Sequence, residues 1–103
     1  MVPAAGRTGV SARTNVSAYF SEAMKATTVN GNTFTLLRNG ATTPVSATIS
    51  YDAVNKRAIL DPSGDLRPGA TYFATVKGGS TGVKDLAGHA LARNKTWAFT
   101  VAS

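Results

Sequence analysis

The chain has 103 residues, a formal net charge of +6 and no cysteine. This length suits one domain that buries about two-thirds of its unfolded surface, and the absence of cysteine excludes disulfides and thiolate metal sites. The basic residues are scattered singly apart from Lys56-Arg57, which argues against a nucleic-acid interface, and no run approaches the roughly 20 apolar residues of a membrane-inserted helix.

Short runs of alternating apolar and polar residues recur along the chain, and this period of two is typical of strands. We predict strands over residues 8–12, 15–20, 33–37, 45–51, 57–61, 72–77 and 96–101. The side chains predicted to share the core are Val16, Ala18, Phe20, Phe34, Leu36, Val45, Ala47, Ile49, Tyr51, Ala58, Leu60, Tyr72, Ala74, Val76, Trp97, Phe99 and Val101.

The connections carry recognisable turn signals. One helical turn is expected within residues 22–32, and Asn39-Gly40 favours a tight turn because both residues tolerate positive φ. Residues 52–56 are predicted to close a hairpin. The long segment 78–95 is predicted to be a loop, anchored by three apolar residues: Val83, Leu86 and Leu91.

A Leu-Arg-Pro-Gly turn at residues 66–69 precedes Tyr72. This arrangement is typical of the tyrosine corner of immunoglobulin-like sandwiches, in which the phenol bonds back to the backbone just upstream. With seven strands at sandwich spacing, we predict an all-β, immunoglobulin-like (fibronectin III-like) sandwich of two antiparallel sheets. We expect residues 1–6 to be a linker without signal-peptide character, residues 7–103 to form the domain, and its ends to lie at opposite poles.

Five motifs stand in order along the chain: Thr8-Gly9-Val10 with Phe20-Ser21-Glu22-Ala23-Met24, Val45 to Asp52, Leu66 to Tyr72, Gly82 to Leu91, and Trp97 to Thr100. Together they resemble bacterial Ig-like domains of the S-layer type. Ala23 and Ala90 stand where that family usually has proline, and His89 where it usually has asparagine. The resemblance implies a structural or spacer module of a larger bacterial extracellular or cell-surface protein, with neighbouring domains as partners and no catalytic residue.

Candidate sites for chemistry are sparse. His89 and Asp85 could pair, but no nucleophile is placed beside them, so we expect a turn rather than a catalytic group. Asp61, Asp65 and Asp85 could converge on calcium, although the closely spaced run of a calcium loop is missing. The glycine-rich residues 78–82 lack a following helix and are interpreted as a flexible connection. We predict no catalytic residue, metal or cofactor.

Two apolar pairs are predicted to point outward: Tyr19 with Ile59 on one sheet, and Leu37 with Phe73 on the other. Such pairs stabilise neighbouring strands or form a contact with another domain. We expect the isolated domain to be a monomer. The alternative function is adhesion to an anionic surface polysaccharide or glycan, suggested by the charge of +6 and the exposed aromatic side chains.

Overall fold

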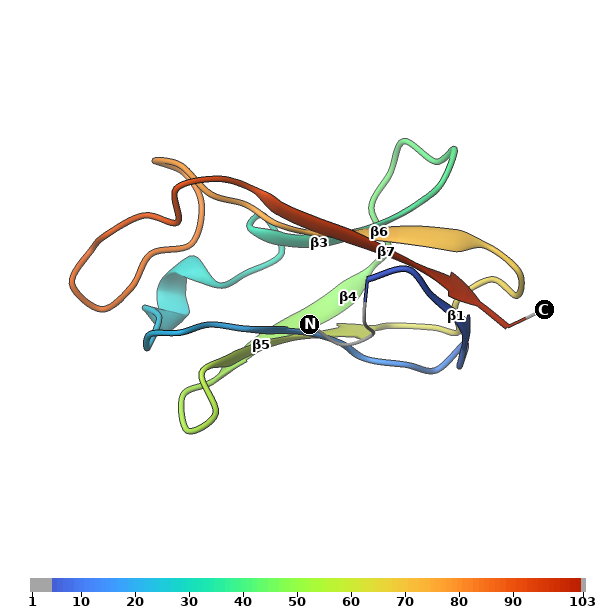
Figure 1. The fold of residues 1–103 in the computed structure, drawn as a ribbon, viewed down its shortest axis with the longest axis horizontal. Helices are drawn as coiled ribbons and strands as arrows, with labels where there is room; N and C mark the ends of the chain where they lie inside the picture. The colour runs from blue at the N-terminus through green and yellow to red at the C-terminus, as the bar shows by residue number, and fades with distance from the viewer. Residues whose placement is uncertain (1–4, 103) are drawn as a thin grey trace.

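The computed structural model describes residues 5–102. Within them the chain forms strands β1 (Arg7–Val10), β2 (Val16–Tyr19), β3 (Phe34–Arg38), β4 (Ala47–Asp52), β5 (Arg57–Pro62), β6 (Thr71–Val76) and β7 (Lys95–Val101), and the 3-10 helix η1 (Ala26–Thr28) (Figure 1). Every predicted strand is present, with its bounds displaced by at most two residues. No helix among the described residues is long and apolar enough to cross a membrane.

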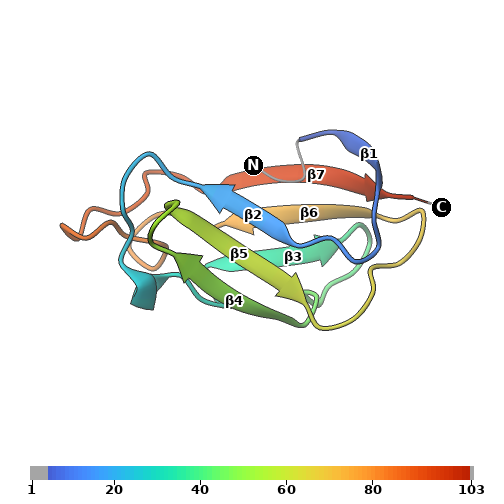
Figure 2. The same ribbon diagram turned by 90° about the horizontal axis from the view of Figure 1, so that it is seen from below.

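The strands form two sheets that pack face to face (Figure 2). One sheet has the order β1-β7-β6-β3 and the other β2-β5-β4, which confirms the immunoglobulin-like sandwich. All strand pairs are antiparallel except β1 and β7, which run parallel with an irregularity between Arg7 and Val10. The two sheets are thus antiparallel apart from this pair, in which the chain enters the fold alongside its own last strand.

The predicted alternation places the apolar side chains between the two sheets. Leu36 and Ala74 are fully buried, and Leu60 is 1% exposed. On the core side of the four-stranded sheet the aromatic rings pack in pairs, with centroids 6.2 Å apart for Phe34 and Trp97 and 6.1 Å apart for Tyr72 and Phe99. The predicted core register is confirmed at these positions. Phe20 and the inward residues of β4 pack against this core but are only half-buried.

The tyrosine corner is present. The Arg67 N–H donates a hydrogen bond of 2.9 Å to the Tyr72 hydroxyl. Leu66, one residue earlier, is 2% exposed, and Gly69 has a φ of 75°, which a residue with a side chain adopts only at a cost. The turn is thus held by a buried side chain, a permissive glycine and the phenol together.

The long loop before β7 is anchored at two of the three predicted residues. Val83 is 1% exposed and Leu91 packs half-buried against the core. Leu86, however, is 71% exposed, so its predicted anchoring role was wrong. The Gly88 N–H bonds to the Asp85 carbonyl at 3.0 Å, and this turn places Leu86 at its tip.

The glycine-rich residues 78–82 are closely packed rather than a loose connection. Gly78 donates its N–H to Asn94 Oδ1 at 2.9 Å, and Val83 donates to the Lys77 carbonyl at 3.0 Å. A Cβ on Gly82 would collide with that same carbonyl oxygen. Glycine is required here because backbone segments touch, which corrects the interpretation as a flexible connection.

The two ends of the described chain do not occupy opposite poles. The Gly6 N–H donates to the Ala98 carbonyl at 2.7 Å, midway along β7, whereas Ala102 follows the end of that strand (Figure 2). We call the end near Ala102 the C-terminal pole. Residues 1–4 of the predicted linker lie outside the described residues.

Candidate functional site

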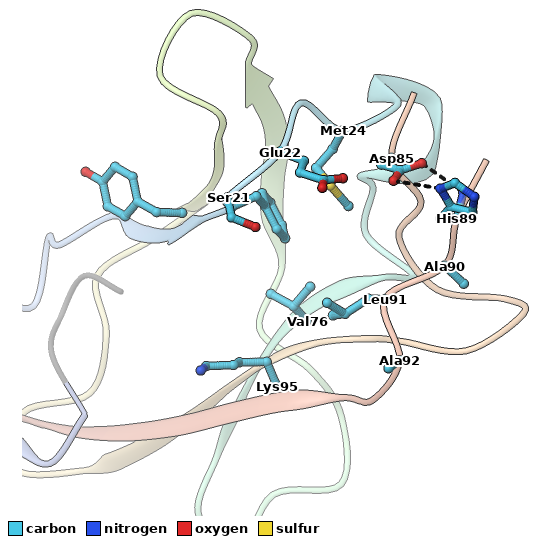
Figure 3. Close-up of a pocket in the computed structure, with 12 residues that line it drawn as sticks. Ser21, Glu22, Met24, Val76, Asp85, His89, Ala90, Leu91, Ala92 and Lys95 are labelled. Carbon is cyan, nitrogen blue, oxygen red and sulfur yellow. Dashed lines mark hydrogen bonds and ion pairs between the residues drawn. The ribbon is translucent and has the colours of Figure 1, made fainter. Parts of the chain in front are cut away.

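A cleft of about 520 Å³ opens at the pole farthest from Ala102, between the segment that follows β2 and the segment that leads into β7 (Figure 3). Its lining combines aromatic, aliphatic and charged side chains. The lining residues are Tyr19, Phe20, Ser21, Glu22, Met24, Val76, Asp85, His89, Ala90, Leu91, Ala92 and Lys95. We call this feature the polar cleft, after its position at this pole of the domain.

The walls of the polar cleft are held by backbone contacts between the segment that follows β2 and the loop that precedes β7. Met24 forms an antiparallel bridge with Asp85, and the Lys25 N–H donates to the Lys84 carbonyl at 2.8 Å. The Met24 N–H also donates to the Tyr51 hydroxyl at 2.8 Å. Tyr51 belongs to β4, so its bond to Met24 ties the segment that follows β2 to β4, and Met24 in turn bridges to Asp85 in the loop that precedes β7.

Asp85 and His89 form a hydrogen-bonded pair in this wall. Asp85 Oδ1 accepts the His89 backbone N–H at 2.8 Å, and Oδ2 lies 3.3 Å from His89 Nδ1. The backbone N–H of His89 is the main cause that lowers the pKa of Asp85, and the nearby His89 ring lowers it further. The carboxylate therefore caps a turn, as the sequence predicted.

This pair does not extend into a catalytic or metal-binding constellation within the described residues. The His89 side chain is 81% exposed, and no side-chain hydroxyl in residues 5–102 bonds to it. No group of three or more His, Cys, Asp and Glu side chains in that range could hold a metal ion. Asp61 and Asp65 line a separate hollow at the C-terminal pole, so the three predicted acids do not meet.

The four residues of the predicted interaction surface are divided between two faces. Leu37 lies directly opposite Phe73 in the β3–β6 pair, and Phe73 is 38% exposed. Tyr19 is 45% exposed, but its partner across the β2–β5 pair is Arg57, while Ile59 lies opposite Ser17. Because the two pairs lie on the outer faces of different sheets, they do not form one surface.

Sequence reasoning missed a polar row on the outer face of the three-stranded sheet. Arg57 bonds to Asp52 at 3.2 Å, and its guanidinium lies 5.9 Å from the ring centroid of Tyr19. The Asn55 side chain is the first cause that lowers the pKa of Asp52, and Arg57 adds to it. The signal was available, since a four-residue hairpin loop places residue 52 opposite residue 57.

The fold recurs in solved structures of low sequence identity. The N-terminal part of the bacterial S-layer protein SbsC is 19% identical with a TM-score of 0.70, over 94% of this chain and 22% of that one. PcoC, a copper resistance protein from Escherichia coli, is 20% identical with a TM-score of 0.75, over 97% and 93% of the two chains. CopC from Methylosinus trichosporium OB3b is 18% identical with a TM-score of 0.74, over 97% and 86%.

The chain spans 13% of the longer S-layer polypeptide rSbsC(31-844). No curated protein matches the sequence. At these identities the structural likeness shows the fold alone. The family model described as bacterial Ig-like domain matches residues 1–101, nearly the whole chain. The motifs, the tyrosine corner and this match agree, and the chain belongs to the bacterial Ig-like domain family.

Proposed function

We propose that this domain is a non-catalytic structural module, which separates or orients neighbouring domains of a larger bacterial extracellular or cell-surface protein. Its family membership supports this role. So does its likeness to an S-layer protein of which it covers a small part. Because a sandwich fold hosts many functions, the proposal needs a physical feature of this chain that suits a load-bearing spacer.

That feature is the parallel pairing of β1 with β7. In this pair Arg7 lies beside Phe99 and Val10 beside Val101. Tension on a spacer enters at the start of β1 and leaves at the end of β7, which are opposite ends of two parallel strands. The pair is then loaded in shear, so that the backbone hydrogen bonds between the two strands must break together before the strands separate.

The connections between the sheets also suit a domain without disulfides. The Arg67–Tyr72 hydrogen bond closes the turn into β6, and the Met24–Tyr51 hydrogen bond joins the polar cleft to β4. Each connects a loop to a strand through a part-buried polar contact, which costs about 1–3 kcal/mol to leave unsatisfied. These contacts support a domain that keeps its shape under load by burial and hydrogen bonding alone.

The outer faces give less support to the adhesion alternative. Tyr19 and Phe73 were the aromatic residues expected to contact an anionic polymer. They lie on different sheets and face away from each other. One polymer strand passing over one face therefore meets only one of them, which favours the spacer role.

The experiment is single-molecule stretching with two pulling geometries. Because the chain has no cysteine, Ala5→Cys with Ala102→Cys provides handles that load β1 and β7 in shear. Ala5→Cys with Arg93→Cys provides handles at the start of both strands and peels β1 from its first residue. All three positions are exposed, so the substitutions leave the core unchanged.

We expect a clearly higher unfolding force in the shear geometry than in the peeling geometry at the same loading rate. Equal thermal unfolding temperatures of the two double variants serve as the control for folding. Equal forces in both geometries would refute the mechanical argument. A saturable increase in melting temperature on adding an acidic glycan would instead support adhesion.

A further inference from the structure

The outer edge of β4 is open in the described structure. β4 ends the order β2-β5-β4 and forms the lower border of the front sheet in Figure 2. Its register with β5 is regular over six consecutive pairs, from Ala47 opposite Pro62 to Asp52 opposite Arg57. A regular antiparallel edge presents the N–H and C=O groups of every second residue outward.

The register identifies which groups point outward. The Ser63 N–H donates to the Ser46 carbonyl, so residues 46 and 63 form a hydrogen-bonded pair. Alternation then makes residues 48, 50 and 52 the groups that bond to β5. Pro62 has no N–H to donate, and it lies opposite Ala47 in a pair that makes no hydrogen bond between β4 and β5. The backbone groups of Ala47, Ile49 and Tyr51 therefore point away from the sheet.

The other three edges carry features that block pairing with another strand. β1 contains an irregular register and Gly9 with a φ of 66°. β3 has its outer edge occupied in part, because the Val45 N–H donates to the Leu36 carbonyl at 2.7 Å. β2 has only four residues. β4 has six residues, with no proline, no bulge and no charge before Asp52, so it lacks the usual protective devices.

The apolar face of β4 is also incompletely covered. Ala47, Ile49 and Tyr51 face the core but stay half-buried, whereas Ala58 and Leu60 on the adjacent strand are 1% exposed. An additional strand at this edge would cover the remaining apolar area and satisfy the outward backbone groups at the same time. Both requirements favour the same occupant, an extended strand with small and β-branched side chains.

We propose that this occupant is β4 of a second copy of the chain, paired antiparallel about a two-fold axis through Ile49. In this register Ile49 meets Ile49 of the second copy and Ala47 meets Tyr51. The pairs use the outward backbone groups of β4 on both sides. Two three-stranded sheets thereby join into one continuous sheet of six strands.

The side chains of β4 are complementary to themselves in this register. The small Ala47 lies opposite the large Tyr51 on the core side, and Thr48 lies opposite Ser50 on the outer side. Asp52 falls opposite Ser46, so no two like charges face each other, which would be destabilising. The sequence alone predicts a monomer; the open edge leads us to expect weak association of the copies, independently of the spacer role.

Cysteine cross-linking tests the register directly. Two residues in a hydrogen-bonded antiparallel pair have Cα atoms about 5.5 Å apart, within the range for a disulfide. Ile49→Cys should therefore give a covalent dimer under mild oxidation. Ala47→Cys is the matched control, because four residues of strand separate the two copies of this position by about 14 Å, and it should stay monomeric. Thermal melts establish that both variants are folded.

Charge substitutions test the interface without cysteine. Thr48→Lys with Ser50→Lys places lysines opposite each other across the axis and should abolish concentration-dependent association in sedimentation velocity. Thr48→Lys with Ser50→Glu places opposite charges across the axis and should preserve it. Ser80→Lys with Thr81→Lys adds the same two charges at exposed loop positions and should leave association unchanged.

Salt gives a further distinction, because each copy carries a net charge of +6. Screening weakens the repulsion between copies, so association of the unsubstituted chain should increase from low to moderate ionic strength. The proposal is overturned if the chain sediments as a monomer at all concentrations. It is equally overturned if Ala47→Cys cross-links as readily as Ile49→Cys, or if the double-lysine variant at positions 48 and 50 still dimerises.

Discussion

Replacing Gly82 with alanine tests how tightly the loop before β7 is packed. A Cβ at this position would lie 2.6 Å from the carbonyl carbon and oxygen of Gly78 and closer still to the Lys77 oxygen, whereas Cβ atoms in proteins keep at least 3.0 Å from such neighbours. All these atoms belong to backbone, so no side-chain rotation can relieve the collision. Overpacking of this kind costs about 1–3 kcal/mol, and we expect the upper end.

A loss of about 3 kcal/mol corresponds to a decrease in melting temperature of about 12–24 °C for a domain of this size. Thermal unfolding followed by circular dichroism measures it. Gly31→Ala is the matched control, because a Cβ at Gly31 meets nothing within 4 Å, and it should change the free energy of unfolding by at most about 1 kcal/mol. Equal melting temperatures for Gly82→Ala and Gly31→Ala would refute the close packing of this loop.

Three further predictions concern the tyrosine corner, the turn at Asp85 and the outer face of the four-stranded sheet. Tyr72→Phe leaves the Arg67 N–H without its partner and should cost about 1–3 kcal/mol in urea unfolding; an unchanged midpoint would contradict the tyrosine corner. The pKa of Asp85 in the folded state is lowered from its ordinary value of 3.8. The ionised carboxylate therefore stabilises the fold above pH 3.8, and this stabilisation is lost as the pH falls through the lowered pKa. Asp85→Asn should therefore make unfolding less sensitive to acid, and an unaltered acid dependence would refute this. A double-mutant cycle between Leu37 and Phe73 should give a coupling of about 0.2–1 kcal/mol in the free energy of unfolding. A coupling of zero would contradict a stabilising role for this cross-strand pair.

The sandwich could be predicted because its strands alternate cleanly. Phe34 and Leu36 share one face of their strand, and both are buried in the core. The turn at residues 66–69 carries a local signal that determines the position of Tyr72. In each of these cases the information lies within a few residues of the chain, where the period of two and the turn residues are directly readable.

The remaining features depend on contacts that are distant in sequence. Leu86 looks apolar enough to anchor a loop, but a turn formed by Asp85 and Gly88 directs it outward. Gly82 resembles a flexible linker residue until the fold brings the Lys77 carbonyl against it. The local sequence pattern determines neither the direction of a side chain at a loop tip nor the distance between two backbone segments. Neither feature could therefore have been predicted from it.

Structural likeness alone does not assign a function to this chain, since an S-layer protein and a copper resistance protein both share its sandwich at 20% identity or less. The features that argue for a role here are properties of the backbone. In the proposed spacer role the parallel β1–β7 pair carries the tension, and in the proposed dimer the regular β4 edge accepts another strand. Neither requires a particular catalytic side chain. Both proposals for this chain therefore rest on how its strands pair, and the pulling and cross-linking experiments test that pairing directly.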